Sequence, residues 1–179
     1  AREQLGATAY GTNTAIFAYG STGSATAVSN LVSSAGVIAT DTSGVGTARY
    51  GLAGAPYGSD KAIFAYGYSG GNLSMSNLVS NTGVIATDTS GVGTARYQLA
   101  AAGYGDDKAI FAFGYLGSDN IADVTNLVSN TGVVATDTAG VGTDRTRLAA
   151  STYGGDKAIL GFGNSNTAST TPTAITNLV

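Results

Sequence analysis

Four arginines recur at nearly constant spacing and are the most regular charged feature of the sequence. They follow one another at intervals of 47, 47 and 49 residues: Arg2, Arg49, Arg96 and Arg145. Eight residues before each of the last three stands an aspartate: Asp41, Asp88 and Asp137. This offset favours a partly buried carboxylate–guanidinium pair across the connection between consecutive units. The alternative is a ring of arginines at a channel mouth that binds an anion or an acidic glycan.

A second group of candidate residues lies in loops that are rich in Gly, Ser and Asn. Tyr68 and Tyr115 each follow an apolar segment and stand at the start of such a loop. Aromatic rings beside small polar residues suit a glycan or protein contact, because a ring stacks well and loses little entropy. We therefore predict a binding surface on segments 68–74 and 115–122. Its candidate contacts are Tyr68, Asn72, Tyr115, Asp119 and Asn120.

The remaining polar side chains form no recurring catalytic or metal-binding set. The sequence has no His and no Cys, which removes the usual general base and the commonest zinc ligands. The Asp-Thr-x-Gly segments, such as 41–44, each offer one carboxylate, which is too few for calcium. The Asp-Lys pairs, such as 107–108, fit hairpin turns, where a lysine stays solvated and is a poor nucleophile. We expect no enzymatic activity, no metal and no cofactor.

The composition narrows the classes of partner. The 179 residues carry a formal net charge of -3, and only 11% of them are charged. Because nucleic-acid binding needs clustered Lys and Arg, we expect no nucleic-acid partner. No apolar run approaches the roughly 20 residues of a membrane helix, and the sequence opens without a basic and apolar leader. We therefore expect no membrane segment and no signal peptide.

A tandem repeat of about 47 residues supplies the elements that position these side chains. The segments 36–50 and 83–97 both read GVIATDTSGVGTARY, and AIFAYG occurs at 15–20 and at 62–67. The spacing predicts one repeat domain with units at 1–48, 49–95, 96–144 and 145–179. We expect the fourth unit to lack its fourth strand, because the sequence given ends at the residue that matches Val128.

Each unit is predicted to form four short antiparallel strands separated by turns. In the third unit these strands are expected near 96–104, 109–114, 124–128 and 133–138. The second strand is apolar on both faces, as in a strand held between two neighbouring sheets. The period and strand count predict an all-β fold, namely a β-propeller with four-stranded blades. A β-solenoid or another stacked β-repeat array is the alternative.

The unit also resembles the kelch repeat. The residues that carry this resemblance in the third unit are Arg96, Ala100 to Ala102, Ile110-Phe111, Phe113-Gly114 and Asp137. The resemblance implies a propeller of kelch-like type. The nearly identical copies, through GVIATDTSGVGTAR and DKAIFAYG, also resemble repeat modules of phage and other virion structural proteins.

These observations predict a structural and interaction module that presents variable loops from a rigid frame. We expect it in a virion or an extracellular assembly, with a protein partner or a second copy of the chain. A two-chain ring is one form of such self-association, because an open arc of sheets exposes apolar faces. The alternative is a lectin-like propeller with one shallow glycan site per unit.

Overall fold

The computed structural model describes residues 1–165 and 172–179, which form strands and no helix. The first and second units contain β1 (Gly6–Tyr10), β2 (Thr14–Ala18), β3 (Ser29–Val32), β4 (Ala53–Tyr57), β5 (Lys61–Ala65) and β6 (Ser76–Val79). The third unit contains β7 (Ala100–Tyr104), β8 (Lys108–Ala112), β9 (Tyr115–Gly117), β10 (Asn120–Ile121), β11 (Val124–Val128) and β12 (Thr138–Ala139). The fourth contains β13 (Ala149–Tyr153), β14 (Lys157–Gly161) and β15 (Thr176–Leu178). The all-β prediction is confirmed.

Each unit folds into one antiparallel sheet with its second strand in the middle. The sheet orders are β1-β2-β3, β4-β5-β6 and β13-β14-β15, and in the third unit β12-β11-β8-β7. The register also repeats, since Ile16 lies opposite Thr8 and Leu31, and Ile63 lies opposite Ala55 and Leu78. Loop residues of the third unit form the additional hairpin β9–β10.

The predicted fourth strand is largely replaced by isolated bridges. In the second unit, Ile85 bridges Val79 and Thr89 bridges Ser76, without a continuous strand between them. In the third unit, the expected strand at 133–138 is reduced to one bridge and the two-residue β12. In the first and second units the predicted four-stranded blade is therefore a three-stranded sheet with a loosely paired outer segment, and the described residues of the fourth unit form a three-stranded sheet.

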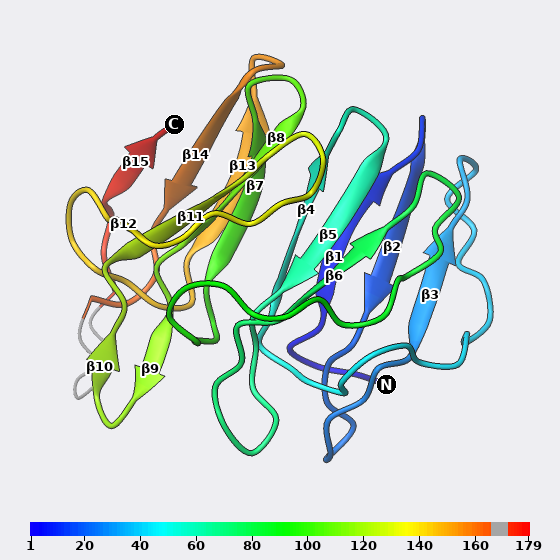
Figure 1. The fold of residues 1–179 in the computed structure, drawn as a ribbon, viewed down its shortest axis with the longest axis horizontal. Helices are drawn as coiled ribbons and strands as arrows, with labels where there is room; N and C mark the ends of the chain where they lie inside the picture. The colour runs from blue at the N-terminus through cyan, green and yellow to red at the C-terminus, as the bar shows by residue number, and fades with distance from the viewer. Residues whose placement is uncertain (166–171) are drawn as a thin grey trace.

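The sheets pack face to face in chain order, with the first unit at the right of Figure 1 and the fourth at the left. The first strands of successive units are neighbours: β1 contacts β4, β4 contacts β7, and β7 contacts β13. This position is crowded, because a Cβ on Gly6 of the first unit would lie 2.9 Å from the Phe64 ring of the second unit. Small residues in the first strand therefore allow two sheets to approach closely. The described residues do not close into a barrel or a ring.

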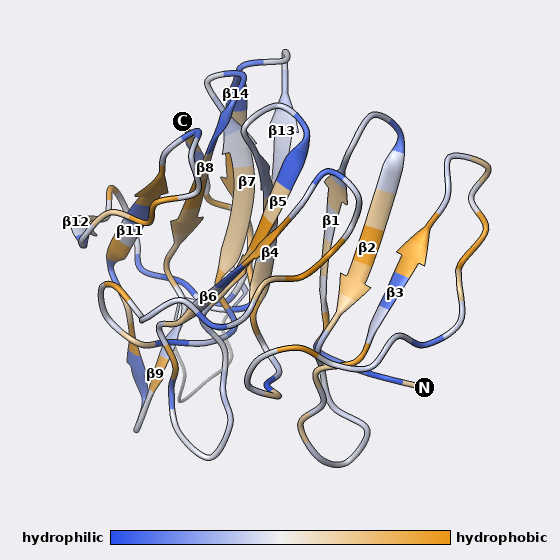
Figure 2. Ribbon diagram, turned by 45° about the vertical axis from the view of Figure 1, so that its right-hand side comes forward, coloured by the Kyte–Doolittle hydropathy of each residue, from blue (hydrophilic) through white to orange (hydrophobic). Residues whose placement is uncertain are grey.

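The hydrophobic core lies between the sheets. The central strand β5 presents Phe64 to the first unit and Ile63 to the third, and both side chains are fully buried. Figure 2 shows these apolar stretches along the strands, with hydrophilic residues at the hairpin ends of β2 and β5. The prediction of a central strand that is apolar on both faces is confirmed.

Backbone hydrogen bonds between units add three ladders to this packing. One runs from glycine amides to arginine carbonyls: Gly20 to Arg49, Gly67 to Arg96 and Gly114 to Arg145, at 2.8 to 3.0 Å. The second joins Gly51 to Gln4, Gln98 to Gly51 and Arg147 to Gln98. The third joins the hairpin turns: Gly11 to Asp60, Gly58 to Asp107 and Gly105 to Asp156. Each joint between units therefore has the same directional contacts.

Candidate functional site

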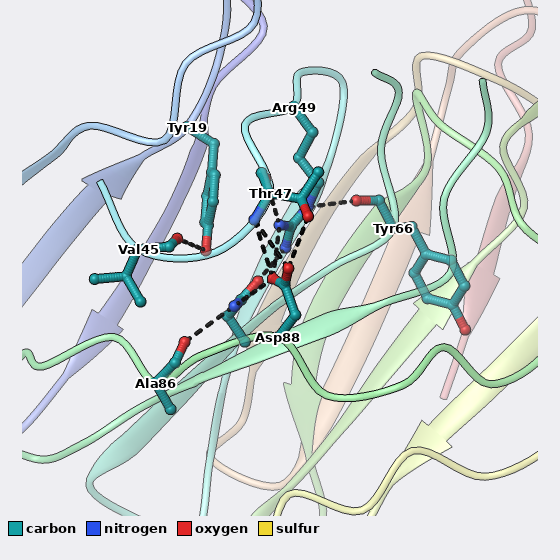
Figure 3. A network of polar contacts seen from close by, with 8 residues as sticks. Tyr19, Val45, Thr47, Arg49, Tyr66, Ala86 and Asp88 are labelled. Atoms are coloured by element: carbon teal, nitrogen blue, oxygen red, sulfur yellow. Dashed lines mark hydrogen bonds and ion pairs between the residues drawn. The ribbon is translucent and has the colours of Figure 1, made fainter. Parts of the chain in front are cut away.

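A buried arginine joins the second unit to the first. Figure 3 shows Arg49, which is fully buried, among its polar partners. Its Nη2 donates to Asn77 Oδ1 at 2.7 Å, and its Nε donates to the Tyr66 carbonyl at 2.8 Å. Its Nη1 donates to the Thr47 carbonyl at 3.1 Å. These three acceptors fix the plane of the guanidinium, a geometry that the single ammonium of lysine does not supply.

The face of the guanidinium lies against an aromatic ring of the preceding unit. Arg49 Cζ is 4.2 Å from the centre of the Tyr19 ring, and Arg96 Cζ is 4.0 Å from that of Tyr66. Both tyrosines have a left-handed backbone, with φ of 63° and 66°, which is uncommon for a bulky residue. The Tyr66 carbonyl accepts from Arg49 while its ring underlies Arg96. This one residue therefore contacts the arginines of two consecutive units.

A carboxylate lies at the edge of this joint and holds the connection between the two units. Asp88 accepts hydrogen bonds from Thr47 Oγ1 at 2.7 Å and from Thr47 N at 3.0 Å. Asn77 Nδ2 donates to Asp88 at 2.9 Å, and Arg49 Nη1 lies 3.9 Å from Asp88 Oδ1. The next joint repeats the hydrogen bonds with Asp137, Thr94 and Asn126.

The structure joins arginines and aspartates in a different order from the predicted one. The expected pairs do not form among the described residues: Asp41 with Arg49, Asp88 with Arg96, and Asp137 with Arg145. Asp41 instead accepts from Asn30 Nδ2 at 2.8 Å. Each aspartate accepts a hydrogen bond from the asparagine eleven residues earlier, which lies in the third strand of the same unit. The arginine of that unit donates to the same asparagine.

The arginines are also placed differently from the alternative of a cationic ring. Arg49, Arg96 and Arg145 are fully buried, and Arg2 is half-buried. A side chain that is hydrogen-bonded inside the protein has no free face for a dissolved anion. Arg49, Arg96 and Arg145 therefore serve the joints between units, where each lies over an aromatic ring of the preceding unit.

The Asp88 carboxyl makes its joint sensitive to acid. Burial raises the pKa of this carboxyl, but hydrogen bonds from Thr47 and Asn77 outweigh burial and leave the pKa below its ordinary value. In the unfolded chain an aspartate ionises near pH ~4. The ionised form therefore stabilises the fold above that pH, and this contribution is lost as the pH falls through the lowered native pKa.

Asp88→Asn is expected to lower the free energy of unfolding by about 1–2 kcal/mol at neutral pH, because the amide cannot accept all these hydrogen bonds. The difference from wild type should shrink as the pH falls below ~4 and through the lowered native pKa, where the folded wild-type carboxylate becomes protonated. Urea unfolding followed by circular dichroism, from neutral pH down to pH ~2, measures this change. Asp106→Asn, at an exposed hairpin turn, is the control. A difference that stays constant with pH would contradict the assigned role.

Tyrosines of the second and third units form a continuous row of half-buried rings. Tyr50 and Tyr68 face each other across a backbone bridge, with ring centres 5.5 Å apart. Tyr97 and Tyr115 repeat this arrangement at 5.3 Å. The row crosses the joint between the units through Tyr68 and Tyr97, whose ring centres are 5.2 Å apart.

This row lines a cleft with a volume of about 550 Å³, here called the tyrosine cleft. Its other lining residues are Gly71, Asn72, Leu116, Gly117 and Ser118. Asn72 Nδ2 donates to the Leu116 carbonyl at 2.8 Å and ties together the loops of the two units. Burial, reinforced by the neighbouring tyrosines, raises the pKa of Tyr97 still further above neutral pH. The cleft therefore offers aromatic faces, hydroxyls and amide groups.

Three of the predicted contacts meet in this cleft, namely Tyr68, Asn72 and Tyr115. The other two, Asp119 and Asn120, are exposed at the β9–β10 hairpin and are not among the lining residues. Asp119 is still close to the row, since its amide donates to Tyr115 Oη at 3.3 Å. The predicted loops therefore lie around the cleft, with the carboxylate and one amide outside it.

Sequence reasoning misses Tyr50 and Tyr97, which belong to the same row. Each directly follows the arginine of its unit and bridges the loop tyrosine 18 residues later. The same bridges carry polar residues in the outer units: Glu3 with Ser21, and Thr146 with Asn164. The sequence signal that could have identified them is that both bridge positions change together to tyrosine in the second and third units.

No family model matches the chain, and no curated protein matches it. The described residues contain no group of three or more potential metal-ligating side chains. Within residues 1–165 and 172–179, no helix is long and apolar enough to cross a membrane. The features of the described residues that bear on function are therefore the joints between units and the tyrosine cleft.

Proposed function

We propose that this chain is a non-catalytic scaffold that binds a partner through the tyrosine cleft. One observation carries the proposal: the same backbone bridge occurs in all four units, but the side chains at its two positions differ between units. Glu3 and Ser21 hold the same bridge as Tyr97 and Tyr115, so the fold does not require rings at these positions. Partly exposed tyrosines that the fold does not need are typical of a contact surface.

The scaffold part of the proposal is a kelch-like propeller arrangement in which each sheet is one blade. The repeat of about 47 residues supports it, and so do the face-to-face sheets and their adjacent first strands. Such a frame keeps its sheets rigid and tolerates different loops. The nearly identical copies favour a place in a virion or an extracellular assembly, where repeated modules present loops to a protein partner.

An oligosaccharide is the second candidate ligand for the same cleft. The apolar face of a sugar ring can stack on tyrosine, while its hydroxyls need amide and hydroxyl partners. The row of rings and Asn72 supply both kinds of group within about 550 Å³. The oligosaccharide would bind at one site, at the joint of the second and third units, whereas the sequence-based alternative expected one site per unit.

The double variant Tyr97→Thr and Tyr115→Asn tests the proposal. It installs the residues of the fourth-unit bridge, Thr146 and Asn164. We expect the free energy of unfolding to change by less than about 1 kcal/mol, because exposed or replaceable side chains contribute little. Urea unfolding measures this. A loss of several kcal/mol would show that the rings are structural and would overturn the binding role.

The oligosaccharide candidate is tested on an array of immobilised glycans, with calorimetric titration of any glycan that binds. We expect the double variant to weaken binding at least tenfold, since a stacked ring contributes about 1–2 kcal/mol. Tyr104→Ala, which changes a half-buried tyrosine outside the cleft, is the control and should leave binding unchanged. A blank array for the wild-type protein would exclude the glycan and favour the protein partner.

A further inference from the structure

The fourth unit exposes the face that the next unit covers in the first three. Tyr19 and Phe113 are 0% and 2% exposed beneath the following unit, whereas their counterpart Phe162 is 60% exposed. Tyr10 is 6% exposed, and its counterpart Tyr153 is 40% exposed. A hollow of about 180 Å³ opens on this face, lined mainly by apolar atoms that include Ile159, Gly161 and Phe162. This surface is called the trailing face.

The first unit exposes the complementary surface, called the leading face. Its residues are Arg2, Leu5, Ala15 and Phe17, all of them half-buried. Their counterparts in the second unit are Arg49, Leu52, Ala62 and Phe64, which are 0 to 6% exposed because they pack against the first unit. The leading face thus carries the arginine, the leucine and the phenylalanine that complete a joint.

We propose that the trailing face of one chain docks on the leading face of a second copy. The internal joints supply the template for this contact. At the first joint, the Tyr19 ring packs edge-on against Phe64 at 5.7 Å and lies beneath Arg49 at 4.2 Å. By the same repeat, Phe162 of one copy meets Phe17 and Arg2 of the other. The partner is a second copy because its leading face carries the residue types that the trailing face packs against inside the chain.

The contact is heterologous, because two different faces meet. Such contacts close into a ring when the rotation per unit allows it and form open polymers when it does not. On the proposed propeller fold, two copies of residues 1–179 supply eight blades, which is within the usual range of about four to eight. We therefore expect a closed dimer with two identical joints. This inference is independent of the tyrosine cleft, so the cleft variant should keep the wild-type mass.

Sedimentation velocity and light scattering of chain 1–179 over a wide concentration range test the docking. The wild-type protein is expected to be a dimer, and Phe162→Asp is expected to raise the dissociation constant at least 100-fold. Phe162→Tyr restores the residue found at Tyr19 and Tyr66 and should keep the dimer. Circular dichroism confirms that the variants stay folded. A wild-type protein that is monomeric up to millimolar concentration would overturn the proposal.

A second variant tests the direction of the contact. Ala15→Glu places a charge on the leading face, at a half-buried position whose counterpart Ala62 is fully buried in a joint. Ala15→Glu and Phe162→Asp should each be monomeric alone. Mixed together, they retain one intact leading face and one intact trailing face, and should form a weaker heterodimer with a single joint. A dimer of Ala15→Glu alone, or no heterodimer in the mixture, would overturn the head-to-tail contact. Larger wild-type polymers would support the joint and overturn ring closure.

Discussion

Arg96→Ala is expected to lower the free energy of unfolding by about 3–5 kcal/mol. The side chain is fully buried at the joint of the second and third units. Its Nε donates to the Phe113 carbonyl at 2.7 Å, its Nη2 to Asn126 Oδ1 at 2.7 Å, and its Nη1 to the Thr94 carbonyl at 2.9 Å. Alanine removes all three donors and leaves buried acceptors without partners, which costs more than the net value of the bonds.

The buried positive charge of Arg96 adds a desolvation cost that a neutral side chain at this joint would not have. Burial lowers the pKa of the Arg96 guanidinium from its ordinary value, because removing a cation from water is costly. The hydrogen bonds and the Tyr66 ring, 4.0 Å from Arg96 Cζ, offset this cost. Arg96→Lys keeps the charge but cannot reproduce the planar set of donors. We therefore expect lysine to recover less than half of the stability lost with alanine.

Urea unfolding followed by circular dichroism measures these differences. Arg147→Ala is the matched control, because Arg147 is exposed and, among the described residues, its side chain donates to Gln98 Oε1 alone, at 3.2 Å. We expect that change to cost less than about 1 kcal/mol. Because the strands of the described residues pack against those of the neighbouring units, Arg96→Ala should also broaden the transition, as the two halves of the chain uncouple. Equal losses for Arg96→Ala and Arg147→Ala would contradict the assigned role.

The repeat predicted the strands correctly where hydrophobic packing alone decides the structure. The third strand of the third unit forms at Val124–Val128, as expected, and the apolar second strand packs on both faces. The fourth strand failed because side chains compete with the sheet for its backbone. Asn77 Nδ2 donates to the Ala86 carbonyl at 3.0 Å and to Asp88, and Val84 beside them is 66% exposed. Sequence alternation cannot reveal such competition.

The partners of Arg49 could not be read from the spacing along the chain. The nearest aspartate in sequence, Asp41, is eight residues away, but the carboxylate beside Arg49 is Asp88, which lies 39 residues later. Both offsets recur from unit to unit, so the repeat is compatible with either aspartate as the partner, and only the fold distinguishes them. The tyrosine cleft was half predicted for a similar reason. Tyr68 was identified by its loop, whereas Tyr97 reaches the same surface through a bridge to Tyr115.

Gly46→Ala is expected to be much more costly than Gly36→Ala, although both glycines have φ of 76°. A left-handed alanine costs about 1–2 kcal/mol by itself, and this part is the same at both positions. A Cβ on Gly36 would meet nothing within 4 Å. A Cβ on Gly46 would collide with Asp88 Oδ1 and lie 2.7 Å from Asn77 Nδ2. Gly46→Ala therefore disturbs the joint at Arg49, whereas Gly36→Ala does not.

The difference between the two alanine variants isolates the packing of the joint, because the backbone cost cancels. We expect Gly46→Ala to lose about 2–3 kcal/mol more than Gly36→Ala, since displacing Asp88 breaks its bonds to Thr47 as well as to Asn77. Urea unfolding at neutral pH measures both variants. In the background of Asp88→Asn the extra loss should shrink, because part of the network is already gone. If the two alanines are equally costly, the contact with Asp88 does not hold the units together.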